Sequence, residues 1–117
     1  MSPSPAPQYL SLERAMDFIG DEDGVLTLLH TLHQTLGDDL SRIAAHVEAG
    51  DVQSANFLLH QLKGFVPVFC VDSLVELVVH AEQLSKAGGA SEVRAAYQTL
   101  APKLAQLHHE VATHLGH

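Results

Sequence analysis

Apolar side chains recur every three or four residues along almost the whole chain from Leu10 onward, which is the spacing of helices that bury one face. No stretch alternates apolar and polar residues for long enough to predict a strand. The spacing predicts five helices, over about residues 11–19, 21–50, 51–69, 73–88 and 91–115. The sequence therefore predicts an all-α fold.

Each expected helix carries one apolar stripe and recognisable end signals. In the short first helix the stripe consists of Leu12, Met16 and Ile19. The spacing of Ser73 and Glu76 predicts a capping box at the start of the fourth helix. Prolines inside the third and last helices, Pro67 and Pro102, should kink or end the first of these and bend the second.

Four long amphipathic helices joined by short turns predict an antiparallel up-and-down four-helix bundle over residues 10–117, with the short first helix capping one end. Residues 1–9 are rich in proline and predict a disordered or extended lead-in. Because no stripe is left unused when the bundle closes, we expect a monomer. Met1 and the lead-in favour a free-standing protein over an excised domain.

Composition narrows the class of protein further. The 117 residues are 46% apolar and 17% charged, which suits one domain with a real core. The net charge of −8 argues against nucleic acid or a membrane surface as a partner. The lone Cys70 excludes an intramolecular disulfide and a zinc site of several cysteines. Neither a signal peptide nor a transmembrane segment is recognisable, so we expect a cytoplasmic protein.

Histidine is the residue type that stands out, and His60 has the most informative place. It falls roughly 150° from the centre of the apolar stripe of its helix, so it should point to solvent. The same side of the helix carries Gln53, Phe57, Gly64 and Pro67, with Lys63 at its boundary.

These residue types suit phosphoryl chemistry. An exposed imidazole titrates near neutrality and offers a nucleophilic nitrogen. Lys63, one turn after His60, would place an ammonium where a phosphoryl group on that nitrogen would sit. Gly64 removes a side chain that would crowd the imidazole, at a helix cost of roughly 1 kcal/mol. Phe57 offers an apolar anchor for a partner.

The stretch His60-Gln61-Leu62-Lys63-Gly64 resembles the His-x-Leu-Lys-Gly motif of histidine-containing phosphotransfer (HPt) domains. The likeness extends over about residues 10–115, including a long helix before the motif and Glu82 late in the helix after it. It implies the four-helix bundle fold. It also implies that His60 accepts the phosphoryl group on Nε2, that Lys63 stabilises it and that Gly64 provides clearance.

The resemblance also implies the partner, which is the receiver domain of a response regulator, of a hybrid histidine kinase, or of both. Mg²⁺ would belong to the receiver, and this chain would need no cofactor of its own. Nothing resembles a kinase or nucleotide-binding domain, so we expect a phosphoryl carrier and not an enzyme. The surface expected to meet the receiver consists of Gln53, Phe57, Gln61 and Pro67.

The chain departs from the family pattern after the motif. Bulky residues replace the usual small ones over residues 65–69, and Cys70 stands where the family has glycine. Pro67 lies on the His60 side of the helix. The alternative function is therefore a helical adaptor that binds a receiver or another protein through this face without being phosphorylated.

A third interpretation is a histidine-rich metal-binding bundle. His30 and His33 share a helix face, and Glu110 and His114 have the spacing of two metal ligands. Neither pair supplies three converging ligands, so we expect ordinary surface histidines and no metal site. His108 and the histidine after it lie beside the core stripe of the last helix, and one of these two should be partly buried.

Overall fold

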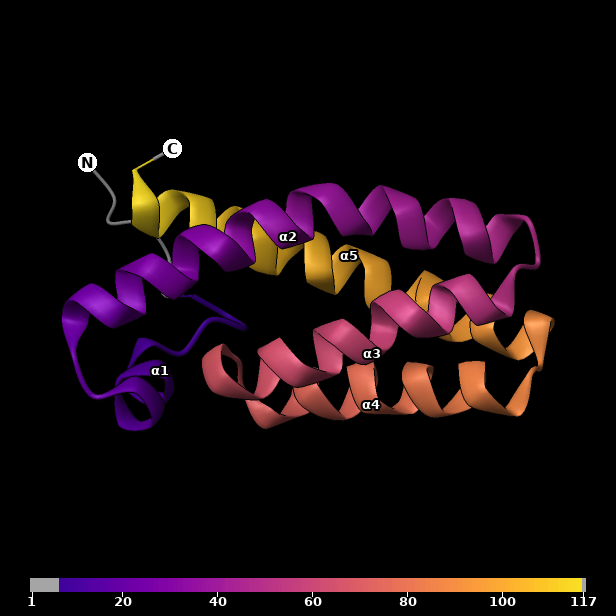
Figure 1. Cartoon of the computed structure of the whole chain (residues 1–117), viewed down its shortest axis with the longest axis horizontal. Coiled ribbons are helices and arrows are strands. Elements are labelled where there is room, and N and C mark those ends of the chain that lie inside the picture. Colours follow the sequence, from indigo (N-terminus) through magenta and orange to yellow (C-terminus); the bar gives the residue numbers. More distant parts are fainter. Residues whose placement is uncertain (1–6, 117) are drawn as a thin grey trace.

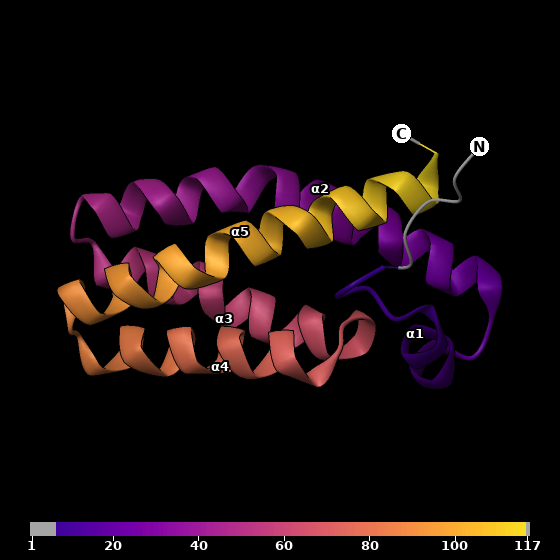
Figure 2. The same cartoon turned by 180° about the vertical axis from the view of Figure 1, so that it is seen from behind.

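The protein is all-helical in a computed structural model that describes residues 7–116 (Figures 1 and 2). The helices are α1 (Leu12–Ile19), α2 (Glu22–Glu48), α3 (Val52–Phe69), α4 (Asp72–Ala87) and α5 (Ala90–Leu115). Over the described residues no strand forms, and the only β-type contact is an isolated antiparallel bridge between Leu10 and Cys70. The predicted all-α class is confirmed.

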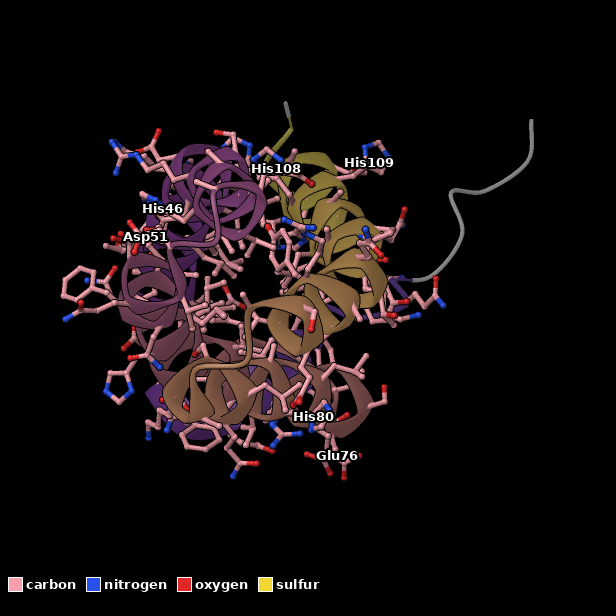
Figure 3. The ribbon with its side chains drawn as sticks, turned by 90° about the vertical axis from the view of Figure 1, so that its right-hand side faces the viewer. His46, Asp51, Glu76, His80, His108 and His109 are labelled. Carbon is pink, nitrogen blue, oxygen red and sulfur yellow. The ribbon has the colours of Figure 1, made fainter. Side chains whose placement is uncertain are left out.

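The four long helices pack around one core. α2 contacts α3 and α5, and α4 also contacts α3 and α5. Viewed from one end, these helices surround a common interior (Figure 3). α1 lies beside the start of α2 and the end of α3 (Figure 1) and contacts both helices. None of the described helices is long and apolar enough to cross a membrane.

Local chemistry accounts for three of the helix ends. Gly20 ends α1 in the left-handed region at φ 90°, which glycine adopts without a steric cost. Asp21 and Asp51 cap α2 and α3, each accepting a hydrogen bond from the backbone N–H three residues on, at 2.6 and 3.1 Å. α2 continues through Gly37 as a single helix, as its unbroken apolar phase predicted.

The predicted capping box at the start of α4 is wrong. This helix begins at Asp72 after Val71, and no side chain caps it, so Ser73 and Glu76 do not play the expected role. The Val71 N–H instead donates to the Tyr9 carbonyl at 3.0 Å. A backbone contact with a distant segment therefore fixes this helix start, and local sequence does not reveal such a contact.

Of the two helical prolines, Pro67 lies near the end of α3 and Pro102 lies near the middle of α5. α3 ends at Phe69, two residues after Pro67, as predicted. α5 runs through Pro102 to its end. It also begins at Ala90, earlier than the expected start after Ser91.

The buried face of α1 differs from the predicted one. Ala15 is its fully buried residue, with Leu12 and Ile19 half-buried on either side. Met16, which we expected in the core, is 38% exposed. α1 packs against two helices, α2 and α3. Ala15 lies on the face of α1 that these helices cover, so it is the most buried residue of α1. Leu12 and Ile19 belong to both the expected and the observed face, and either Ala15 or Met16 completes a three-and-four spacing between them, so the spacing alone does not choose between the two.

The segment before α1 is attached to α5 by Glu110. Its carboxylate accepts backbone hydrogen bonds from Gln8 and Tyr9 at 2.9 Å and from Leu10 at 3.0 Å. Gln8 and Tyr9, which we included in the lead-in, therefore lie against the helices. The part of the lead-in over residues 1–6 lies outside the described residues.

Candidate functional site

His60 projects from the middle of α3 with 62% of its side chain exposed, as the helix phase predicted. Leu59 and Leu62 on the opposite side of the helix are fully buried. The His60 Nδ1 atom lies 3.2 Å from Oε1 of Glu82 on α4. One ring nitrogen is therefore engaged with a carboxylate, while most of the ring meets solvent.

Glu82 is the centre of a small charged cluster, which we call the Glu82 cluster: His60, Lys63, Glu82 and Lys86. Its side chain has no exposed surface. Lys63 Nζ lies 3.3 Å from Oε2, and Lys86 Nζ lies 3.0 Å from Oε1. Two of the three lysines in the chain thus converge on one carboxylate. Two ammonium groups against one carboxylate leave a local positive charge on an otherwise acidic protein.

Two further polar side chains fix α4 against α3 next to the cluster. Ser85, which is buried, donates to the Glu82 backbone carbonyl at 2.6 Å. The Asn56 amide on α3 donates to Ser85 Oγ at 2.8 Å and lies 3.4 Å from the same carbonyl. The Asn56 bonds link α3 to α4 directly beside Glu82 and so help to hold its carboxylate near His60.

Glu82 is ionised in this setting. Burial alone would raise its pKa, but the hydrogen bonds from Lys86, His60 and Lys63 outweigh burial and lower the pKa to about 2. An ionised carboxylate only accepts hydrogen bonds, so the neutral His60 ring places its proton on Nδ1 to donate to Glu82. We assign this tautomer from the hydrogen bond; it leaves a lone pair on Nε2.

Gly64 leaves open space on the surface of α3. A Cβ atom at this position would meet no other heavy atom within 4 Å, so the packing of the chain does not require glycine there. A mid-helix glycine costs about 1 kcal/mol relative to alanine. The gap that it leaves is therefore available to something outside the chain.

The remaining expected contact residues differ in accessibility. Phe57 is 64% exposed, and Gln53 and Gln61 are also exposed. Pro67 is half-buried, and its carbonyl accepts a hydrogen bond from Arg14 Nε of α1 at 2.8 Å. The structure thus leaves Phe57 open and partly covers Pro67 at the α1 end of the helix.

Cys70 lies in the core. It is fully buried beside the N-terminal segment, and burial raises the pKa of its thiol to about 12. The residue that departs from the family's glycine therefore lies away from the exposed side of α3, and its thiol is in the unreactive neutral form.

The other histidines gather no metal ligands among residues 7–116, where no group of three suitable side chains occurs. Glu110 is occupied by the backbone of the N-terminal segment and not by His114. His108 is half-buried and stacks on His33 of α2, with ring centroids 4.5 Å apart. His109 points outward (Figure 3), so one of this neighbouring pair is partly buried, as predicted.

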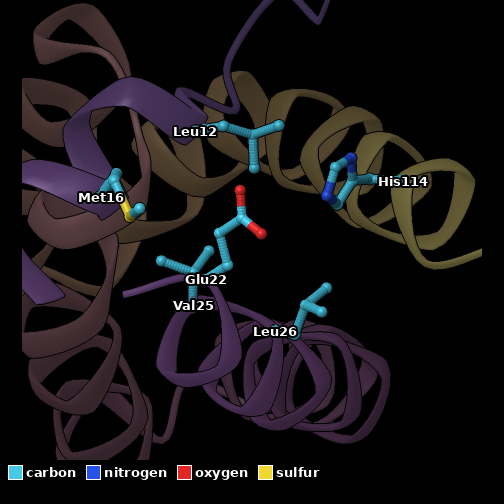
Figure 4. Close-up of a pocket in the computed structure, with 6 residues that line it drawn as sticks. All are labelled: Leu12, Met16, Glu22, Val25, Leu26 and His114. Carbon is cyan, nitrogen blue, oxygen red and sulfur yellow. The ribbon is translucent and has the colours of Figure 1, made fainter. Parts of the chain in front are cut away.

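A separate pocket of about 360 Å³ lies between α1, α2 and α5. Figure 4 shows the Glu22 side chain extending from α2 into the middle of the lining residues, with Leu12 of α1 and His114 of α5 around its carboxylate. The other lining residues are Met16, Val25 and Leu26. No residue of α3 or α4 lines this pocket, so it is distinct from the Glu82 cluster.

Sequence reasoning placed His60, Lys63 and Gly64 on one side of α3 but did not find the roles of Glu82 and Lys86 at the site. Glu82 does carry a local signal, because it lies four residues after the buried Val78 and so is a charged residue on an apolar helix face. Such a residue needs a charged or hydrogen-bonding partner. Only the packing of α3 on α4 shows which one.

An exposed imidazole with one nitrogen held by an ionised carboxylate and with ammonium groups beside it has the chemistry of a carrier for a transferred anionic group. Residues 27–114 match the family described as Hpt domain, and the chain belongs to this family. Hpt domains are phosphocarrier modules of two-component phosphorelays that interact with receiver domains, and they are not enzymes with catalytic machinery of their own. No curated protein and no solved structure matches the chain.

Proposed function

We propose that this protein relays a phosphoryl group between the aspartates of receiver domains, belonging to a hybrid histidine kinase and a response regulator, through phospho-His60. The observation that carries the proposal is the 3.2 Å contact between His60 Nδ1 and the buried Glu82 carboxylate. With Nδ1 held in this way, Nε2 is the nitrogen left to attack.

In the proposed step the Nε2 lone pair attacks the phosphorus of a phospho-aspartate. The N–P bond forms, the P–O bond breaks, and its electron pair stays on the aspartate carboxylate. The Nδ1 proton remains in place, and the ring gains positive charge that Glu82 offsets. The reverse step passes the group to the next receiver. Mg²⁺ belongs to the receiver, and no cofactor is assigned to this chain.

Lys63 and Gly64 have supporting roles in this proposal. The Lys63 ammonium, held near the ring by Glu82, offsets the charge of the phosphoryl oxygens. The open space at Gly64 admits the phosphoryl group and the receiver surface that brings it. Both roles follow from the position of each residue one turn after His60.

The receiver docks over the exposed side of α3 in this proposal. Phe57 supplies the apolar anchor, Gln53 and Gln61 supply polar contacts, and Pro67 lies at the edge of the surface. We further propose a cytoplasmic monomer in which residues 10–117 form one up-and-down four-helix bundle. The packing of α3 on both α2 and α4, and of α5 on both α4 and α2, supports this helix order.

Phosphotransfer from a panel of pre-phosphorylated receiver domains tests the proposal, with His60→Gln as the variant. We expect wild type to gain phosphate that resists alkali and is lost in acid, and the variant to gain none while keeping its helicity by circular dichroism. Equal uptake by His60→Gln would overturn the assignment. Receiver binding without any transfer would instead support the adaptor function.

A further inference from the structure

We propose that Lys86 is a positioning residue that keeps the buried Glu82 carboxylate neutralised and thereby frees Lys63 to move onto the phosphoryl group. This inference rests on the proposed function. It assigns different roles to the two lysines of the Glu82 cluster, only one of which lies on the helix of His60.

The two lysines contact different oxygens of Glu82. Lys63 lies at Oε2 and is 31% exposed, whereas Lys86 lies at Oε1, which His60 Nδ1 also contacts, and is 56% exposed. Lys86 comes one turn after Glu82 on the same helix, so their pairing depends on α4 alone. Lys63 comes one turn after His60 on α3 and reaches Glu82 across the helix interface. Movement of Lys63 toward His60 therefore leaves the contact between Lys86 and Glu82 intact.

The burial of Glu82 makes a second cation necessary. A carboxylate with no exposed surface is strongly disfavoured unless cations or hydrogen-bond donors compensate it. An arriving phosphoryl group carries about two negative charges and attracts Lys63 away from Oε2. With Lys86 in place, Glu82 keeps one ammonium and the Nδ1–H of His60. Without Lys86, Lys63 has to remain on Glu82, and the phosphoryl group loses its cation.

A direct contact between Lys86 and the phosphoryl group or the receiver is the competing explanation, and a change of background separates the two. Glu82→Gln removes the buried charge, so Lys63 is free in this background whether Lys86 is present or not. The Lys86→Gln substitution should therefore slow transfer in wild type and have little effect in Glu82→Gln. A direct contact would slow transfer equally in both backgrounds.

The experiment measures the transfer rate from a pre-phosphorylated receiver domain to four proteins: wild type, Lys86→Gln, Glu82→Gln and the double variant. We expect Lys86→Gln to slow transfer about tenfold in the wild-type background, the size of a coupling between contacting groups, and less than about twofold in Glu82→Gln. Lys86→Arg should restore the rate. Lys103→Gln, which removes the third lysine from α5, is the control for lost charge and should leave the rate unchanged.

Each outcome decides between the explanations. Equal slowing by Lys86→Gln in both backgrounds, or no slowing in wild type, overturns the role of Lys86 and leaves the proposed function standing. If wild type itself accepts no phosphate, the proposed function fails, and this inference fails with it. Circular dichroism of every variant shows whether a slower rate reflects lost helix.

Discussion

Glu82 and Glu110 are both buried carboxylates with lowered pKa values, but different kinds of donor stabilise them. In each case burial acts to raise the pKa and hydrogen bonds overcome it. Glu110 accepts from three consecutive backbone N–H groups, of residues 8–10, and from the Gln106 side chain. Glu82 accepts from His60, Lys63 and Lys86, all of which are partly exposed side chains.

This difference explains how one residue type serves two purposes. Backbone donors are fixed by the fold, so Glu110 acts as a permanent attachment of the N-terminal segment to α5. Side-chain donors can rotate, exchange with water and respond to an incoming charge, so in the proposed function the charge of Glu82 can respond to the phosphoryl group. Of the two buried carboxylates, Glu82 is therefore the better candidate for a reactive site, because its donors are accessible side chains.

Removing the charge from each carboxylate in turn tests this difference most strongly. Glu110→Gln should lower the free energy of unfolding by about 2 kcal/mol, because an amide NH₂ replaces an oxygen that faces a backbone N–H. Glu82→Gln should lower it by a smaller amount, because its lysine partners are partly exposed and can turn to water. Urea unfolding measures both values. Equal losses would show that the two sites do not differ in the way described.

Acid titration sharpens the same comparison. The pKa of Glu82 is lowered from 4.5 to about 2, so its stabilising contribution is complete above about pH 4.5 and is lost as the pH falls toward 2. Unfolding free energy followed over this range should therefore depend less on pH in Glu82→Gln than in wild type. High salt should also weaken the wild-type dependence, because exposed lysines supply the stabilisation. An unchanged pH dependence in Glu82→Gln would contradict the ionised Glu82 cluster.

Gly64 offers a smaller effect in which stability and transfer change in opposite directions. Gly64→Ala should raise the free energy of unfolding by up to about 1 kcal/mol, since the new Cβ meets nothing within 4 Å. It should also slow phosphotransfer, because the methyl group enters the space beside His60. Unfolding and transfer assays on the same sample check both.

Gly37→Ala is the matched control for this prediction. It adds a methyl group to α2, in contact with His108 Nε2 at 3.4 Å, and should not change transfer. Transfer at the wild-type rate by Gly64→Ala would contradict the clearance role of Gly64.

Local periodicity was sufficient to predict much of the fold. The five helices, the unbroken phase of α2 and the exposure of His60 follow from spacing alone, because a helix repeats its faces every few residues. Periodicity was less reliable where few residues define it. In α1 the spacing allowed either Ala15 or Met16 between Leu12 and Ile19, and the structure buries Ala15.

Features that depend on contacts between distant segments could not be predicted in this way. The start of α4 is set by the bond from Val71 to Tyr9, and the partners of Glu82 are set by the register of α3 on α4. The sequence does show that Glu82 is a charged residue on an apolar face. It does not show that His60 lies opposite.

The proposed mechanism requires that Glu82 hold Nδ1 of His60 and leave Nε2 to accept the phosphoryl group. Long-range ¹H–¹⁵N NMR of the His60 ring, recorded while the ring is neutral and again after phosphotransfer, tests it directly. We predict a proton on Nδ1 before transfer and phosphorus coupled to Nε2 afterwards. A proton on Nε2 before transfer, or phosphorus on Nδ1 after it, would contradict the claim.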